Sequence, residues 1–138
     1  MAENNYLGID VSKGYADFTI LDQKKSCVEK NFQFDDTFAG HNALYKFLVY
    51  FFKANPETHL YAAVESTGGY ENNWYNSLSK WQSIFPLSVA RVNPFGVNYN
   101  SKATLNRIVT DKQSAKNIAD YMISHPEKVA YQNQDYFS

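Results

Sequence analysis

Cysteine, signal-like segments and long apolar runs are all scarce in this chain, and each scarcity excludes a class of protein. The single cysteine, Cys27, leaves no internal disulfide framework and no cysteine-rich zinc cluster. The most apolar stretch, residues 44–52, is too short to cross a bilayer and contains Lys46. No basic segment followed by an apolar stretch opens the chain, so we expect no signal peptide. These observations together predict a cytoplasmic protein without a membrane partner.

Net charge is also nearly absent, although the basic residues are unevenly placed. The formal total of −1 does not mark a nucleic-acid binder. Residues 91–116 nevertheless hold five basic residues and one acid, Asp111. Such a stretch could seat a phosphate backbone near a metal ion, but charge alone favours a solvated loop and helix face. The residues expected to contact nucleic acid are Lys13, Arg91, Lys102, Arg107, Lys112 and Lys116.

Apolar residues are plentiful enough for a real core. Hydrophobic residues make up 44% of the 138 residues and aromatic residues 17%, which argues against global disorder. This length suits one compact domain. We expect that domain to span residues 1–123, and residues 124–138 to be a linker or the start of a truncated helical segment, because they show no clear period.

The first third of the chain has the period of β-strands. Residues 6–11 alternate, with their apolar side chains on one face. Further strands are predicted at residues 15–21 and 27–34, each reached by a short polar turn. Three consecutive strands joined in this way form an antiparallel meander.

The rest of the chain alternates between helical and strand patterns. Apolar residues recur at helical spacing over residues 38–52 and 74–81, and short apolar strands are predicted at residues 60–64 and 87–92. A last helix is predicted to open at Thr110, which begins a capping-box pattern. Right-handed crossovers make the last two strands parallel to the first. The order β-β-β-α-β-α-β-α predicts an α/β fold, an RNase H-like mixed five-stranded sheet with flanking helices.

Three acids stand at positions where chemistry is plausible. Asp10 lies inside an apolar strand, where a carboxylate is costly unless it is paired or holds a metal. Glu65 ends the fourth strand, and ligand crevices lie at the carboxyl ends of parallel strands. Asp111 begins the last helix on the same side as Ala115. Each acid alone has an ordinary explanation: a structural partner, an exposed strand end, or a favourable helix dipole.

Together the three acids come from distant parts of the chain to compatible ends of their elements. Hard oxygen ligands that converge in this way suit Mg²⁺ or Mn²⁺. Such ions activate the attacking oxygen and stabilise the leaving oxygen of a phosphodiester. The three histidines show no spacing typical of metal ligands.

Four motifs resemble the N-terminal domain of DEDD-type insertion-element transposases, relatives of the Piv-type DNA invertases with a RuvC-like fold. The motifs are GIDVSK at residues 8–13, ESTGGY at 65–70, VNP at 92–94 and TDK at 110–112, the last followed by Ala115. The resemblance covers about residues 5–123. It implies catalytic and metal-binding roles for Asp10, Glu65 and Asp111. The fourth acid of the family pattern falls on Ser114, a weak neutral ligand, which makes one metal position doubtful.

The resemblance also implies a function and partners. Full-length relatives continue into a C-terminal domain with a serine nucleophile, without which we expect the isolated domain to be inactive. The implied activity is DNA strand cleavage and exchange, a phosphodiester transfer, during transposition. A divalent metal, a homo-oligomer and, in part of the family, an element-encoded guide RNA are implied as well.

Two other functions remain open at this point. Loss of the fourth acid at Ser114 favours a nucleic-acid binding and assembly module with a degenerate metal site. The Gly-Ile-Asp strand and turn at residues 8–10 also opens nucleotide-binding domains of the actin-like and sugar-kinase class. That class expects a second similar half and a glycine-rich phosphate loop, for which Lys13 and Gly14 are a thin match.

Overall fold

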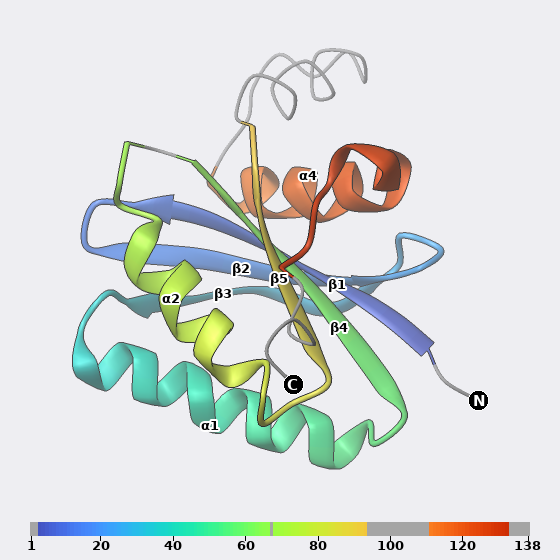
Figure 1. The fold of residues 1–138 in the computed structure, drawn as a ribbon, viewed down its shortest axis with the longest axis horizontal. Coiled ribbons are helices and arrows are strands. Elements are labelled where there is room, and N and C mark those ends of the chain that lie inside the picture. Colours follow the sequence, from blue (N-terminus) through green and yellow to red (C-terminus); the bar gives the residue numbers. More distant parts are fainter. Residues whose placement is uncertain (1–2, 67, 94–110, 133–138) are drawn as a thin grey trace.

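A five-stranded mixed sheet forms the centre of the computed structural model, which describes residues 3–66, 68–93 and 111–132, excepting the side chains of residues 111–114. The strand order is β3-β2-β1-β4-β5 (Figure 1). The elements in chain order are β1 (Glu3–Ser12), β2 (Tyr15–Asp22), β3 (Cys27–Asp35), α1 (Phe38–Ala54), β4 (Thr58–Glu65), α2 (Asn72–Trp81), β5 (Leu87–Val92), α4 (Asp111–Ser124) and the 3₁₀ helix η1 (Pro126–Lys128).

The strand directions agree with the sequence-based prediction. β1, β2 and β3 form an antiparallel meander, and β4 and β5 lie parallel to β1 and to each other. The predicted mixed sheet and its element order are therefore confirmed. Strand and helix ends differ from the prediction by a few residues, since β1 begins at Glu3 and β4 at Thr58. Thr110, the predicted start of the last helix, lies outside the described residues.

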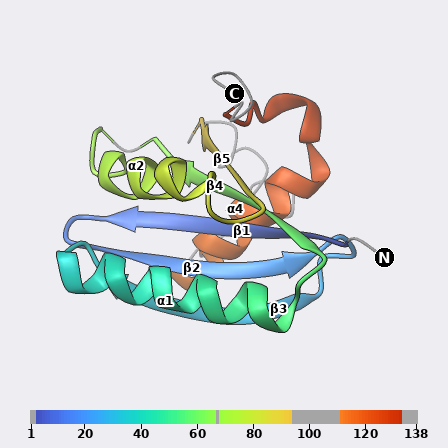
Figure 2. The same ribbon diagram turned by 60° about the horizontal axis from the view of Figure 1, so that its bottom comes forward.

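Helices cover both faces of the sheet (Figure 2). α1 and α2 pack on the face that buries Leu7 and Ile9 of β1, around the fully buried Trp74. α4 packs on the other face, against β1, β2 and β4, with Ile118 and Met122 buried. The alternation of side chains along each strand therefore decides which residues face α4.

A close backbone approach fixes where α4 crosses the sheet. A Cβ atom on Gly8 would overlap the carbonyl oxygen of Ala115 and lie 2.7 Å from the amide nitrogen of Ala119. At the far end of the helix, the Lys25 ammonium in the β2–β3 turn lies 3.0 Å from Asp120 Oδ1. The N-terminal end of α4 therefore points toward the carboxyl end of β1.

The segment after α4 packs on the domain as far as Gln132. Val129 is buried with α4 and β5 residues, and the Gln132 amide donates a 2.8 Å hydrogen bond to the Val89 carbonyl on β5. The division predicted at residue 123 stays a prediction. No helix in the described ranges is long and apolar enough to cross a membrane.

Candidate metal centre

Asp10 and Glu65 lie on neighbouring parallel strands. Ile9 of β1 pairs with Val64 of β4, so the next residues along, Asp10 and Glu65, are neighbours across the strand pair. Ile9 and Val64 both face α1 and α2, which places both acids on the opposite face, the one that α4 covers. The structure thus brings together two of the three acids that the sequence singles out.

The sequence dictates this placement through the burial of the residues around each acid. Leu7, Ile9 and Val11 are buried on the α1–α2 face, so Asp10 projects toward the other side. β4 is buried on both faces over Ala62, Ala63 and Val64, and Glu65 is its last residue. Both acids therefore lie near the carboxyl ends of the parallel strands β1 and β4, where ligands bind in sheets of this kind.

Burial changes the electrostatics of Glu65. The side chain is half-buried, and this loss of solvation raises the pKa of the Glu65 carboxyl above its usual value. A nearby divalent cation would act in the opposite direction, because it favours the charged carboxylate. A carboxyl whose pKa is shifted by burial is typical of a functional site.

Asp111 begins α4, the helix that lies over this face. The predicted inward stripe of the helix is buried, since Ala115, Ile118 and Met122 are each at most 1% exposed. Asp111 precedes Ala115 by one helical turn, and Ala115 lies against Gly8, two residues before Asp10. The side chains of Asp111 and Ser114 lie outside the described residues. Among the side chains that are described, no three Asp, Glu, His or Cys residues gather in a metal-binding group.

Sequence reasoning missed the contacts that hold the loop after Glu65. Glu71 is 6% exposed and its Oε1 accepts a 3.0 Å hydrogen bond from the Gly69 amide. Its Oε2 lies 3.5 Å from Arg91 Nε. Arg91 also donates a 2.7 Å hydrogen bond to Asn72 Oδ1 and stacks 3.9 Å from the Tyr75 ring centroid. No signal in the sequence pairs residue 71 with residue 91, because the contact depends on how α2 packs beside β5.

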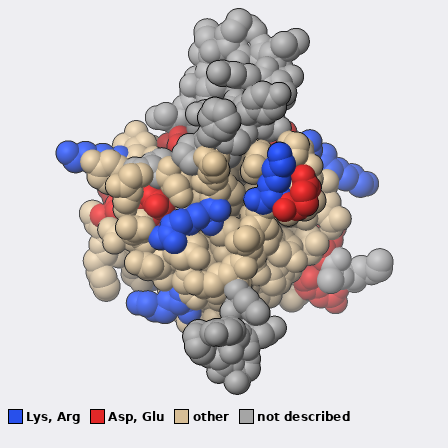
Figure 3. All heavy atoms as spheres, turned by 45° about the horizontal axis from the view of Figure 1, so that its top comes forward, with Lys and Arg blue, Asp and Glu red and all other residues tan. Residues whose placement is uncertain are grey.

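The predicted nucleic-acid residues are only partly placed. Lys13 is exposed in the β1–β2 turn, Lys116 is exposed on α4, and Arg91 is exposed but occupied by its contacts with α2. Lys102, Arg107 and the side chain of Lys112 lie outside the described residues. On the face that Figure 3 presents, the described Lys and Arg side chains stand as separate groups.

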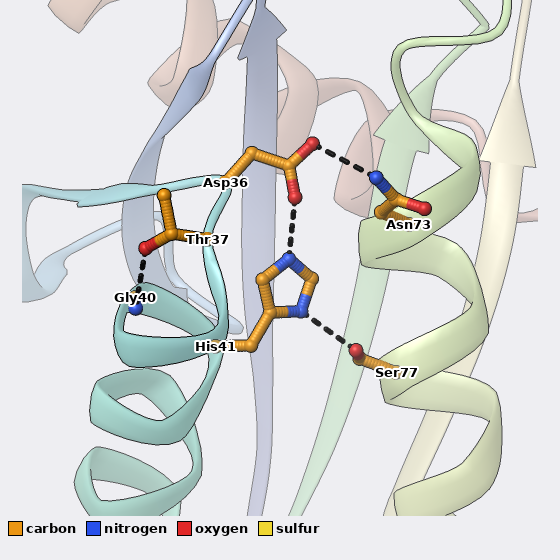
Figure 4. A network of polar contacts seen from close by, with 6 residues as sticks. All are labelled: Asp36, Thr37, Gly40, His41, Asn73 and Ser77. Atoms are coloured by element: carbon orange, nitrogen blue, oxygen red, sulfur yellow. Dashed lines mark hydrogen bonds and ion pairs between the residues drawn. The ribbon is translucent and has the colours of Figure 1, made fainter.

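A hollow of about 620 Å³ lies between α1 and α2, away from the acids of the candidate metal centre. In it His41 Nε2 is 2.7 Å from Asp36 Oδ1, and His41 Nδ1 is 2.7 Å from Ser77 Oγ (Figure 4). Asn73 Nδ2 donates to the other Asp36 oxygen at 3.2 Å, and the His41 ring stacks 4.0 Å from Trp74. Ser77 sits in the middle of α2, where main-chain amides are used within the helix and offer no oxyanion hole. This network ties the two helices together.

Comparisons with known proteins agree with this fold. A family model described as a transposase, the DEDD type of IS110, matches residues 7–136. The structure of RuvC from T. thermophilus in complex with a Holliday junction substrate is similar, with a TM-score of 0.69 and 9% identity over 93% of this chain and 99% of that chain. A search of curated proteins finds no match.

At this identity the RuvC likeness shows the fold alone, and it confirms the predicted RNase H-like class. The actin-like and sugar-kinase alternative is not favoured. The family model matches nearly the whole chain. The chain therefore belongs to the DEDD transposase family of the IS110 type.

Proposed function

We propose that this transposase domain binds Mg²⁺ or Mn²⁺ through Asp10, Glu65 and Asp111, and that it acts there on a DNA phosphodiester. The observation that carries the proposal is the placement of Asp10 and Glu65 side by side at the carboxyl edge of parallel strands, below the helix that Asp111 begins. Carboxylate oxygens are the donors that Mg²⁺ and Mn²⁺ prefer. The donor set therefore fits the ion.

The protein's own residues have separate tasks in this proposal. Asp10 and Glu65 bind and neutralise the cation, and the half-buried position of Glu65 keeps water from screening that attraction. Glu71 and Arg91 hold the loop that follows Glu65. A bound divalent ion supplies charge stabilisation for phosphodiester transfer. The resemblance to DEDD transposases, which implies a divalent metal, supports the proposal.

DNA is the proposed substrate because the chain is a transposase and the similar RuvC structure holds a Holliday junction substrate. Exposed Lys13 and Lys116 are proposed to contact backbone phosphates together with Lys102, Arg107 and Lys112. Arg91 takes part only by positioning the loop, since its guanidinium is already bound within the domain. A guide RNA and a homo-oligomer are proposed from the family resemblance.

Calorimetric titration of Mn²⁺ tests this function. We expect the wild-type domain to bind Mn²⁺ and Asp10→Asn to lose at least about tenfold in affinity, because a direct carboxylate ligand is removed. Glu3→Gln is the matched control, since Glu3 is an exposed acid at the opposite end of the same strand. The metal-free melting temperature of Asp10→Asn should stay equal or rise, because one of two neighbouring acids is neutralised.

A second candidate is the binding and assembly module without a working metal site. Ser114 favours it, because a neutral residue stands where the family pattern has its fourth acid. Wild-type protein that binds DNA but shows no Mn²⁺ binding would establish this alternative. A large drop in the metal-free melting temperature of Asp10→Asn would show instead that Asp10 is a structural residue.

A further inference from the structure

A second carboxylate, Asp17, lies buried beside the proposed metal centre. Asp17 of β2 pairs directly with Asp10 of β1 across the antiparallel ladder. Residues that oppose each other in such a pair project to the same face, so Asp17 also points to the α4 side of the sheet. Only 3% of Asp17 is exposed. Two acids therefore stand opposite each other on a largely buried face.

The two oxygens of Asp17 have different surroundings. Oδ1 accepts hydrogen bonds from Asn31 Nδ2 at 3.2 Å and from Gln33 Nε2 at 3.1 Å, both on β3. Oδ2 is buried without a hydrogen-bond partner. Within the described part of the chain, no lysine, arginine or histidine forms an ion pair with Asp17. The amides from β3 thus orient the carboxylate from one side and leave its other oxygen unsatisfied.

An arrangement of this kind is unfavourable without a positive charge close by. A buried carboxylate pays a desolvation cost that a neutral amide pair does not repay, and a like charge on the opposing strand adds to it. A cation at Asp10 would offset both effects. Asp17 is not assigned as a direct ligand, because the described acids do not converge on one point.

We propose that Asp17 is a positioning acid of the divalent-cation site, which supplies a further negative charge on the strand that pairs with Asp10. The inference rests on the proposed function, since it takes a cation at Asp10 as given. Its physical basis is the unsatisfied Oδ2 on the Asp10 face. Groups just outside the ligand shell tune the metal, and their substitution typically lowers metal affinity by about 10- to 100-fold.

The substitution Asp17→Asn separates charge from packing. The asparagine is nearly the same size, and its carbonyl oxygen can accept the same bonds from Asn31 and Gln33. Its amide group replaces the oxygen that has no partner, so the contacts with β3 survive and only the negative charge is lost. Thermal melting followed by circular dichroism verifies that the variant is folded.

The test is calorimetric titration of Mn²⁺ into wild type, Asp17→Asn, Asp10→Asn and the control Glu3→Gln. We expect Asp17→Asn to weaken Mn²⁺ binding by about 10- to 100-fold while its metal-free melting temperature stays equal or rises. The rise in melting temperature on adding Mn²⁺ should shrink accordingly. Wild-type affinity in Asp17→Asn, or a lower metal-free melting temperature with unchanged affinity, would overturn the inference.

The two proposals fail in different ways. If the wild-type domain binds no Mn²⁺, the proposed function is wrong. If Asp10→Asn loses Mn²⁺ binding but Asp17→Asn keeps it, only the role of Asp17 is wrong.

Discussion

Gly8 lies so close to Ala115 that a methyl group at position 8 would overlap the Ala115 carbonyl oxygen. This contact sets the depth at which α4 crosses β1, and with it the position of the N-terminal end of the helix relative to Asp10. The glycine in the motif Gly-Ile-Asp thus has a packing role that is separate from any turn. Glycine is required at position 8 because the atoms that a Cβ would meet belong to the α4 backbone, which cannot rotate away as a side chain can.

Gly8→Ala should therefore destabilise the domain by about 3 kcal/mol, the upper end of ordinary overpacking costs, because α4 must shift away from the sheet. Denaturant unfolding measures the loss. Gly14→Ala is the control, since its φ of +91° is strained for alanine but the space around it is open. We expect that control to lose about 1 kcal/mol. Equal losses would show that the α4 contact adds nothing.

Glu65 should give metal-free stability a distinct pH dependence. Burial raises the pKa of the folded Glu65 carboxyl above its ordinary value of 4.5. Its contribution to the free energy of unfolding is then fully present below the unfolded-state pKa and is lost as the pH rises through the raised folded-state pKa. Glu65→Gln should flatten this fall, as measured by urea unfolding across that pH range in the presence of a chelator. A fall of the same size in Glu65→Gln would assign it to another group.

Mn²⁺ binding should depend on the same proton. Because the ion needs the charged carboxylate, wild-type affinity should increase as the pH rises through the raised pKa of Glu65. Glu3→Gln should retain this dependence, since Glu3 is exposed at the far end of β1. Affinity that is independent of pH in this range would argue against Glu65 as a ligand.

Variants of Arg91 distinguish a role in positioning the loop after Glu65 from a role in contacting DNA. Arg91→Ala removes one partner of the buried Glu71, the bond to Asn72 and the stacking on Tyr75, so we expect a loss of about 1–3 kcal/mol in unfolding free energy. Arg91→Lys keeps the charge but not the planar fork, and it should recover only part of this stability. An unchanged stability of Arg91→Ala would contradict the positioning role, and weaker DNA binding with a reduced salt dependence would show that Arg91 also contacts DNA.

The sequence predicts the layout of this domain well because the relevant signals are local. Alternation around Leu7 and Ile9 indicates which way Asp10 faces, and the apolar run before Glu65 indicates a strand end. Asp17 was missed for a physical reason. In the sequence Asp17 alternates with Ala16 and Phe18, as a solvent-facing strand residue does. The face of β2 that carries Asp17 is buried because α4 crosses it.

The partners of Arg91 were missed for the same kind of reason. Its basic side chain, read in isolation within residues 91–116, fits a phosphate contact. Its partners in the structure, Glu71, Asn72 and Tyr75, lie on and before a helix that reaches it only through packing beside β5, and the phosphate contact stays a prediction. Contacts between elements distant in sequence leave no periodic signal.

The most direct test of the metal centre is a crystal of the domain soaked in Mn²⁺, with anomalous density measured at the carboxyl edge of β1 and β4. The account predicts an anomalous peak within ligand distance of the Asp10 and Glu65 carboxylates, with Asp111 from α4 completing the set and Asp17 behind it. In a parallel soak, Asp10→Asn should lose this peak and Glu3→Gln should keep it. A well-ordered wild-type crystal with no peak between these acids, or with carboxylates more than about 10 Å apart, would contradict the account, because ligands lie only about 2 Å from such an ion.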